Sequence, residues 1–504
     1  MSVHRVMGIE TEYGIYAPND RRISPELLSA QVVNAYADLL YPSRTDLPKW
    51  NYYRETPFQD LREIQSLQYG LDGFPTEFVA PNIPNLMLPN GARLYVDHAH
   101  PEFSTPEVTN PLAATIWDVA GEHIMRRASE LASQLSGNEI VLYKNNTDGK
   151  GASYGTHENY QVSRSVPFEC FVNGLTPFFV TRNIWAGAGR VGIGQESQQP
   201  GFQISQRADF FEALVGVETT VNRPIINTRD EPHDDPTKFR RLHVIVGDAN
   251  LSPHMTFLKM GATALVLAMI EDDALDLNFS LAEPVSQMYQ VSRDLTLKTP
   301  VQLSNGTQLS ALEIQRWYWQ RAVAYVGSSQ DEQTLSIMRL WDRVLSGLEA
   351  DQESLYGLVD WITKKKLLDS VRQRDKTDWS DAKLSTIDLQ YSDLRSNKSL
   401  YLLAFQSSYQ EELFPQSIVQ DAISQPPLDT RAFFRGTIMN RFSDQVVAAS
   451  WESLILRMSD GRHARIHLEG AADFTVEKFG QVANSDLGLA EVLALLGSIV
   501  EIEQ

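Results

Sequence analysis

Cysteine is almost absent from this sequence, which has only Cys170 in 504 residues. A single thiol cannot form an internal disulfide, so the chain is not built for an oxidising compartment. Residues 168–172, Phe-Glu-Cys-Phe-Val, alternate in a way that predicts the interior of a strand. We therefore expect Cys170 to be a buried, unreactive thiol.

Positive charge is also scarce. The chain has 44 Lys and Arg residues against 64 Asp and Glu residues, which gives a formal net charge of −20. Because binding by phosphate neutralisation needs a basic surface, nucleic acid is excluded as the expected partner. The short basic runs are more typical of solvated helix faces than of anion grooves: Arg126-Arg127, Arg240-Arg241 and Lys364-Lys365-Lys366.

Long hydrophobic runs are missing as well. The longest, residues 261–270, is bounded by Lys259 and Glu271, is too short to cross a bilayer, and predicts a buried helix. The chain begins without the basic and then apolar segments of a signal peptide. We therefore expect no membrane partner and a cytoplasmic location.

The remaining composition is that of a globular protein, with 42% hydrophobic and 21% charged residues. Helical patterns cover residues 24–40, 110–136, 255–270 and 311–374. Residues 43–85, rich in Pro, Gly and aromatics, predict a long irregular loop, which we expect to be mobile and to tune activity. Gln425-Pro-Pro427 predicts a boundary between a domain of residues 1–427 and a small domain of residues 428–504.

Residues 187–192 match the dinucleotide fingerprint G-x-G-x-x-G, but their context does not fit it. A polar segment, residues 195–201, follows where a helix should open, and no strand-helix-strand unit frames the glycines. We therefore reject this motif as a nucleotide site.

Two strand-like segments carry charged residues on one face. After the turn at Asn90-Gly91, alternation places Arg93, Tyr95 and Asp97 on one side and the apolar Leu94 and Val96 on the other. The same period-two rule gives Glu10 and Glu12 a common face. We expect the two segments to lie side by side and to form one polar floor.

Such a floor repels itself unless a cation sits on it. The oxygen side chains of Glu10, Tyr95 and Glu102 suit Mg²⁺, which commonly arrives with nucleotide phosphates. The alternative is a solvated sheet face of ion pairs, each contributing little to stability. Alternation alone does not choose between the two.

Several long motifs, in a fixed order, resemble those of the Pup ligase and Pup deamidase/depupylase family. They lie at residues 7–14 (MGIETEYG), 90–97 (NGARLYVD), 100–102 (HPE), 144–148 (KNNTD), 153–160 (SYGTHENY), 224–233 (PIINTRDEPH) and 240–248 (RRLHVIVGD). The resemblance covers nearly the whole chain. It implies an α+β fold related to glutamine synthetase, in which a curved antiparallel sheet packed on helices cradles Mg-ATP beside a small C-terminal domain.

Within the family, this chain resembles the hydrolase branch. That branch has an insertion like residues 43–85 before the central strand, and a short Asp97 to His100 spacing, where ligases typically carry a longer segment. The implied activity is deamidation of the C-terminal glutamine of Pup and cleavage of the isopeptide bond in pupylated proteins, linked to the bacterial proteasome. The alternatives are a Pup-protein ligase and a non-catalytic Pup-binding adaptor.

The resemblance also implies roles for individual residues. Asp97 matches the catalytic aspartate, as nucleophile or as base. Glu12 is a further candidate ligand by its shared face. The resemblance assigns magnesium to Glu10, Tyr95 and Glu102, and ATP contacts to Arg93, Thr105 and Trp451. For His157, Arg207 and Arg229 we expect contacts with phosphates or a developing oxyanion, although either arginine alone is also compatible with a plain surface position.

Overall fold

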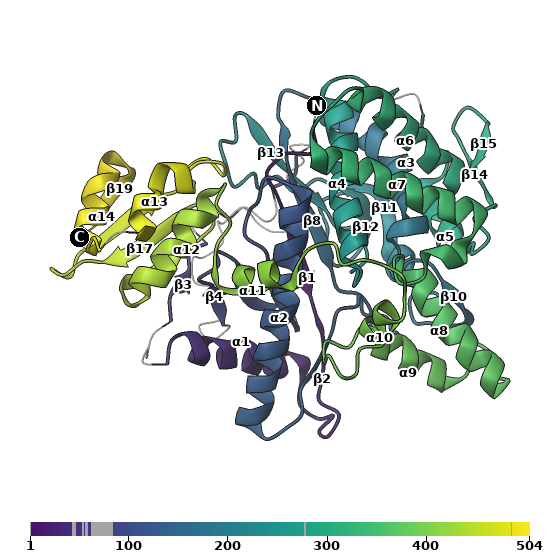
Figure 1. Ribbon diagram of the computed structural model, residues 1–504, viewed down its shortest axis with the longest axis horizontal. Coiled ribbons are helices and arrows are strands. Elements are labelled where there is room, and N and C mark those ends of the chain that lie inside the picture. The colour runs from purple at the N-terminus through teal and green to yellow at the C-terminus, as the bar shows by residue number, and fades with distance from the viewer. Residues whose placement is uncertain are drawn as a thin grey trace.

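A six-stranded sheet organises the fold (Figure 1). The computed structural model describes residues 2–42, 47–52, 55, 59–61, 84–276, 279–484 and 486–503. Every neighbouring pair of strands in the sheet is antiparallel. The strand order is β13 (Phe239–Val244), β8 (Thr156–Ser163), β1 (Met7–Glu12), β6 (His100–Ser104), β5 (Arg93–Asp97) and β4 (Asn85–Met87).

The two predicted polar segments, β1 and β5, belong to this one sheet, but they are not direct neighbours. β6 lies between them, because the chain turns back immediately after β5 and pairs Asp97 with His100. The expectation that the segments lie side by side is therefore wrong in detail. The intervening strand contributes Glu102 to the same surface, opposite Glu12 on one side and Tyr95 on the other.

Helices cover the apolar face of the sheet. Alternation buries Ile9, Leu94, Phe103, Tyr160 and Leu242, each at most 2% exposed. These side chains join two hydrophobic clusters, to which the four helices packed next to the sheet contribute. The helices are α1 (Pro25–Leu40), α2 (Pro111–Ser136), α3 (Phe168–Ala186) and α4 (Pro253–Glu271).

The helix ends follow from their sequence. The Ser24 hydroxyl accepts a hydrogen bond from the Leu27 amide at the start of α1, and the Asn110 side chain caps α2 in the same way. Gly137 ends α2 with a φ of 72°, a conformation that glycine adopts without strain. α4 is long and apolar enough by composition to cross a membrane, but 89% of its most apolar window is buried inside the protein.

The prediction of a strand around Cys170 is wrong. Pro167 precedes the first turn of α3, and Cys170 lies half-buried in that turn as a free thiol. Five alternating residues were too short a window to exclude the start of a helix. The G-x-G-x-x-G run follows α3 and leads into a strand, the reverse of the strand-to-helix order that a dinucleotide site needs.

The other elements lie around this core. Short paired strands are β2 (Gly14–Tyr16), β7 (Val141–Tyr143), β9 (Arg190–Ile193), β10 (Gln199–Gln203), β11 (Phe211–Gly216), β12 (Arg223–Asn227), β14 (Pro300–Gln302) and β15 (Gln308–Ser310). Further helices are α5 (Pro284–Arg293), α6 (Ala311–Val326), α7 (Glu332–Ala350), α8 (Asp360–Asp375), α9 (Ala382–Tyr391), α10 (Leu400–Gln406) and α11 (Gln416–Ser424).

The last part of the chain, drawn in yellow on the left of Figure 1, forms most of a five-stranded sheet and of a core cluster that Tyr41, Trp50 and Met87 also join. β3 (Lys49–Trp50), from the start of the 43–85 segment, extends this sheet by pairing parallel to β16. The elements are α12 (Arg431–Phe442), β16 (Val446–Ala449), β17 (Ser453–Arg457), β18 (His463–His467), α13 (Val476–Asn484), α14 (Leu489–Leu496) and β19 (Val500–Glu503). The α+β prediction is confirmed, and the domain boundary at 427/428 stays a prediction.

Candidate active site

The polar face of the six-stranded sheet gathers most of the predicted site residues. Strand register places Glu10 opposite His157, and Glu102 opposite both Glu12 and Tyr95. Side chains opposite each other in an antiparallel pair point to the same face. The sheet therefore presents carboxylates, a phenol and imidazoles together on one surface.

Three carboxylates form what we call the carboxylate cluster: Glu12, Asp97 and Glu102. One oxygen of each lies within 4.8 Å of the others. Glu102 is 3% exposed, and burial, together with the charges of Asp97, Glu12 and Glu10, raises its pKa well above the usual range. The buried carboxylate of Glu102 therefore lies next to two further acidic groups.

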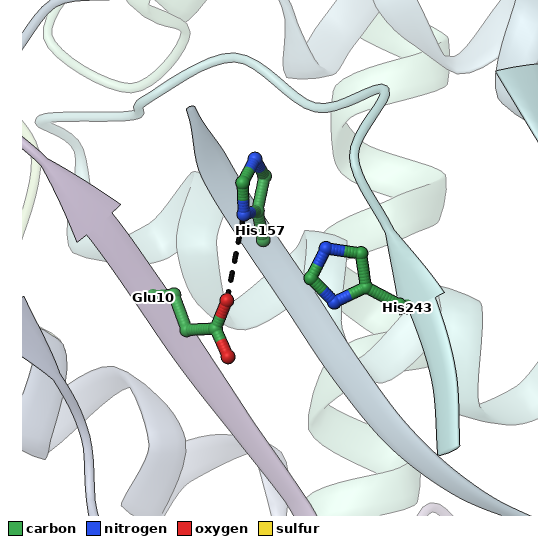
Figure 2. A group of neighbouring side chains, drawn as sticks. All are labelled: Glu10, His157 and His243. Atoms are coloured by element: carbon green, nitrogen blue, oxygen red, sulfur yellow. Dashed lines mark ion pairs between the residues drawn. The ribbon is translucent and has the colours of Figure 1, made fainter. Parts of the chain in front are cut away.

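Glu10, His157 and His243 form a second group, the histidine cluster, shown in Figure 2. His157 Nδ1 lies 3.4 Å from Glu10 Oε2, and the two imidazole centres are 4.9 Å apart. Arg241 adds a contact of 3.4 Å to Glu10 Oε1. Burial raises the pKa of Glu10, but the hydrogen bond with His157 and the charges of His243 and Arg241 bring it far below its ordinary value.

His243 is 2% exposed, and burial, followed by the charge of Arg241, lowers its pKa well below the usual value. Its Nε2 atom is buried without a hydrogen-bond partner among the described residues. The unpaired nitrogen of a neutral imidazole can accept a hydrogen bond or bind a metal ion.

Asp97 ends β5 at the edge of this surface, with 40% of its side chain exposed. Its Oδ2 atom lies 2.8 Å from Nδ1 of His98, which takes the left-handed conformation with φ 51°. Burial raises the pKa of Asp97, but the hydrogen bond with His98 and the charges of His98, His157 and Arg93 outweigh it and lower that pKa. Asp97 is therefore ionised at neutral pH and open to a substrate.

Arg93 and Tyr95 stand next to the carboxylates. The Arg93 guanidinium carbon lies 3.9 Å from the centre of the Tyr95 ring, and its Nε donates to Asn85 at 2.9 Å. The Ser104 hydroxyl donates to the Tyr95 phenol at 3.4 Å. Burial and the charge of Glu102 raise the pKa of Tyr95 well above its usual value, so the phenol stays neutral.

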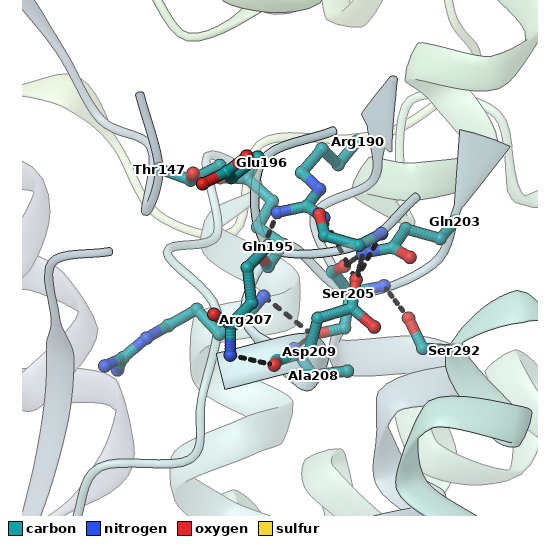
Figure 3. A network of polar contacts seen from close by, with 12 residues as sticks. Thr147, Arg190, Gln195, Glu196, Gln203, Ser205, Arg207, Ala208, Asp209 and Ser292 are labelled. Atoms are coloured by element: carbon teal, nitrogen blue, oxygen red, sulfur yellow. Dashed lines mark hydrogen bonds and ion pairs between the residues drawn. The ribbon is translucent and has the colours of Figure 1, made fainter. Parts of the chain in front are cut away.

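Arg207 approaches the carboxylate cluster from a buried turn and is 1% exposed. Its Nη1 donates to the Ile245 carbonyl at 2.5 Å, and its backbone is held by Ser205 and Asp248. Figure 3 shows its guanidinium extending away from the polar network around Asp209. Burial, and then the charge of Arg223, lower the pKa of Arg207 to about 10, while Glu12 acts in the opposite direction.

Arg229 carries a charge that acts on both clusters. Burial and the charge of Arg241 lower its pKa, while Glu231, Glu10 and Asp97 raise it. Its Nε is buried without a hydrogen-bond partner among the described residues. Because a buried donor without a partner is costly, this arginine is suited to an anionic ligand.

A cavity of about 80 Å³ opens beside the histidine cluster. Glu10, Thr105 and Trp451 line it, which brings together three residues predicted to hold magnesium or ATP. The Ile9 amide donates to Thr105 Oγ1 at 3.0 Å, which fixes that hydroxyl at the cavity wall.

These residues fit a magnesium-nucleotide complex. Oxygens of Glu12, Asp97 and Glu102 lie within 4.8 Å of one another, and burial together with the neighbouring carboxylates raises the pKa of Glu102, so a divalent cation would neutralise charge here. Carboxylates and a neutral phenol are oxygen donors of the kind that Mg²⁺ prefers. The predicted ligands divide, however: Glu102 groups with Glu12 and Asp97, and Glu10 groups with the imidazoles.

The sequence did not identify His243 and Arg241 as site residues. It gave Glu12 only as a further candidate ligand, whereas the structure places Glu12 in the carboxylate cluster with Asp97 and Glu102. A signal for the first two existed, because Arg241 and His243 are two apart in a strand and so share a face. Their position beside Glu10 depends on the pairing of β13 with β8. Most of the predicted irregular loop, residues 43–46, 53–54, 56–58 and 62–83, lies outside the described residues.

Comparisons with known proteins show the family to which the chain is related. A family model described as Pup-ligase protein matches residues 5–455. A protein named depupylase from Acidothermus cellulolyticus is 48% identical over 90% of this chain and 91% of its own length. A protein named Pup deamidase/depupylase from Mycobacterium tuberculosis is 46% identical over 92% of this chain and 93% of its own. A protein named Pup-protein ligase from Mycolicibacterium gilvum is 40% identical over 71% of this chain and 80% of its own length.

Two solved structures resemble the fold. One is the complex between the prokaryotic ubiquitin-like protein Pup and its ligase PafA, with a TM-score of 0.79 and 29% identity over 98% of this chain and 96% of that one. The other is PafA in complex with ADP, with a TM-score of 0.73 and 33% identity over 79% and 89%.

Proposed function

The chain belongs to the family of Pup-ligase proteins, and on that premise we propose that it is a Pup deamidase and depupylase. It hydrolyses the side-chain amide of the C-terminal glutamine of Pup to glutamate. It also hydrolyses the isopeptide bond that joins Pup to lysines of other proteins. Its partners are Pup and pupylated proteins, with a functional link to the bacterial proteasome and a cytoplasmic location.

We choose hydrolase over ligase because the chain is more similar to relatives named as depupylases than to a relative named as a ligase. Relatives named for deamidation or depupylation are more similar, and over more of this chain, than the relative named as a ligase. The short turn after β5 supports the same choice, because it pairs Asp97 with His100 and leaves Asp97 at the tip of a hairpin.

We assign Mg-ATP as the bound cofactor. Glu10, Tyr95 and Glu102, with Glu12 beside them, would hold the magnesium, while Arg93, Thr105, Trp451, His157, Arg207 and Arg229 would contact the nucleotide or a phosphate. When bound, the cofactor supplies positive charge and phosphate oxygens next to the scissile amide. Because amide hydrolysis runs downhill, the cofactor is not needed as an energy source.

Asp97 carries the chemistry, by one of two routes. As a nucleophile, its ionised carboxylate attacks the amide carbon, the carbon–nitrogen bond breaks, and the nitrogen leaves as ammonia or as the lysine amine with a proton from water. Water then opens the resulting anhydride to two carboxyl groups. As a base, Asp97 takes a proton from a water that attacks the same carbon, and the proton passes to the leaving nitrogen.

The arginines serve both routes. Negative charge develops on the amide oxygen during attack, and preorganised donors stabilise it most when they are held in place beforehand. Arg207 meets that condition, since its backbone and Nη1 are fixed by hydrogen bonds. Arg229 offers a buried Nε that no described residue uses.

Three incubations with ATP and Mg²⁺ test the assignment. Pup ending in glutamine should release ammonia, a pre-made Pup conjugate should be cleaved, and Pup ending in glutamate with a lysine acceptor should give little conjugate. Efficient conjugation without cleavage would make the chain a ligase. A folded protein that binds ATP and Pup but turns over none of the three substrates would be an adaptor.

A further inference from the structure

Trp50 contacts Arg93 from a segment that the sequence reading treated as irregular loop. We propose that Trp50 is a positioning residue which fixes the Arg93 guanidinium for nucleotide binding, and that the described residues within 49–61, in the first part of the 43–85 segment, build part of the active site. The inference rests on the proposed function, because it takes Arg93 as a nucleotide contact. It goes further by giving Trp50 a role, and by stating how part of the 43–85 segment contributes to the site.

The aromatic geometry around Arg93 supports this assignment. The Arg93 guanidinium carbon lies 3.8 Å from the centre of the Trp50 ring and 3.9 Å from that of Tyr95. Two rings thus flank one guanidinium. Trp451, on the cavity wall, meets Trp50 edge to face at 5.4 Å with an interplanar angle of 76°.

Stacking of this kind settles where the charge of Arg93 can act. When aromatic rings stack on a guanidinium, they cover its two faces. Its N–H donors then point outward in the plane of the guanidinium. Nε already donates to Asn85, whose Nδ2 in turn donates to the Tyr52 phenol at 2.9 Å. The rings and Asn85 together fix the direction in which the remaining donors point.

Trp50 is itself held firmly. It is 7% exposed, and Lys49 and Trp50 pair with Ala448 and Ala449 of β16. Its indole Nε1 donates to Glu55 Oε1 at 2.5 Å. The neighbouring Asn51 amide donates to the Ala449 carbonyl at 2.8 Å. These contacts hold the Trp50 ring in one place, so the ring can fix the position of the Arg93 side chain.

Residues 59–61 of the same segment reach a second arginine of the site. The Leu61 amide donates to the Thr228 carbonyl and the Asp230 amide donates to the Gln59 carbonyl, both at 2.8 Å. These bonds clamp the backbone on either side of Arg229. Trp50, Gln59 and Leu61, all from the first part of the 43–85 segment, therefore restrain arginines that we assign to the nucleotide.

ADP binding, measured by titration calorimetry without any turnover, tests the inference. Trp50→Ala should weaken ADP binding about tenfold, the loss expected for a desolvated cation–π support. Trp50→Phe keeps a ring over Arg93 and should weaken it less than about threefold. In deamidation, Trp50→Ala should raise the KM for ATP with little change in kcat.

Trp379 offers a matched control, because Arg372 stacks on its ring at 4.1 Å in the α8 to α9 region. Trp379→Ala should lower Tm and leave ADP affinity unchanged. If Trp50→Ala fails to fold, Asn85→Leu removes the bonds from Arg93 and to Tyr52 and should also weaken ADP binding. ADP affinity equal to wild type in folded Trp50→Ala, or in folded Asn85→Leu if the first does not fold, would overturn the inference.

The two proposals fail separately. Normal ammonia release by the wild type together with unchanged ADP affinity in Trp50→Ala would remove the role of Trp50 and leave the hydrolase. No turnover by the wild type together with weakened ADP binding in Trp50→Ala would remove the hydrolase and keep the positioning role.

Discussion

The carboxylate cluster and the histidine cluster lie on the same face of one sheet, yet they treat buried negative charge in opposite ways. In the first, Glu102 sits beside two more carboxylates and its pKa is raised. In the second, Glu10 sits beside two imidazoles and Arg241, and its pKa is lowered. The two glutamates lie on neighbouring strands: Glu102 of β6 is opposite Glu12 of β1, and Glu10 is two residues before Glu12.

The contrast shows which cluster needs a cation. Glu10 of the histidine cluster already has a positive partner in Arg241, so this cluster needs no further cation. The carboxylate cluster has gathered like charges and is strained until a divalent cation arrives. We therefore expect metal to act chiefly on the carboxylate cluster, and the following changes break or sharpen that difference.

The largest effect should come from Asp97→Asn, which removes the reactive group from the carboxylate cluster and leaves the histidine cluster intact. Turnover should fall by about 10²- to 10⁴-fold, the range for loss of a positioned acid, base or nucleophile. ADP affinity should stay within about twofold. Ammonia release and calorimetry measure the two quantities.

Asp460→Asn is a matched control, because Asp460 is an exposed carboxylate paired with Arg462 in the turn between β17 and β18. It should leave turnover unchanged. If Asp97→Asn kept full activity, Asp97 would have neither of the proposed roles.

Glu10→Gln should destabilise the metal-free protein. It removes the charge that faces His157 and Arg241, each at 3.4 Å, and contacts of this kind contribute about 1–3 kcal/mol. The lowered pKa of Glu10 means that its contribution is present above pH 4.5 and lost as pH falls. Denaturant unfolding near neutral pH, in the presence of a chelator, measures the loss.

Glu12→Gln is the same chemical change two residues away and should have the opposite sign. It relieves repulsion in the carboxylate cluster and should stabilise the metal-free protein by about 0.5–1 kcal/mol. The same substitution should reduce the stabilisation by added Mg²⁺. Equal signs for the two variants would contradict the distinction between the clusters.

The smallest effect should be a pH slope. Because the folded-state pKa of Glu102 lies above its ordinary value of 4.5, the folded protein holds an extra proton at pH values above 4.5, and metal-free stability should fall as pH rises from there. Glu102→Gln, or saturating Mg²⁺, should flatten this slope. Unfolding midpoints measured from about pH 5 to about pH 8 report it, and a wild-type slope unaffected by either treatment would contradict the origin in Glu102.

Much of the polar surface could be predicted from local sequence. Period-two alternation was enough to place Arg93, Tyr95 and Asp97 on one face and Leu94 on the other, because strand geometry fixes this whatever the partner strand. The helix starts at Ser24 and Asn110 could also be predicted, because a capping residue followed by proline is a signal within a few residues.

Relations between strands were harder to predict. A single sequence does not contain the register of β13 on β8, so the approach of His243 to Glu10 could not be derived. The position of β6 between β1 and β5 was missed because its hairpin turn spans only a few residues. Trp50 escaped notice because β3 is two residues long and gains its order only by pairing with a distant strand.

The account depends most on the hydrolysis of a side-chain amide by this chain. Wild-type protein with ATP and Mg²⁺ should convert Pup ending in glutamine to Pup ending in glutamate, visible as the mass change from amide to acid, with one ammonia released for each Pup converted. Pup recovered with its amide intact, after incubation with folded protein that binds ADP, would contradict it.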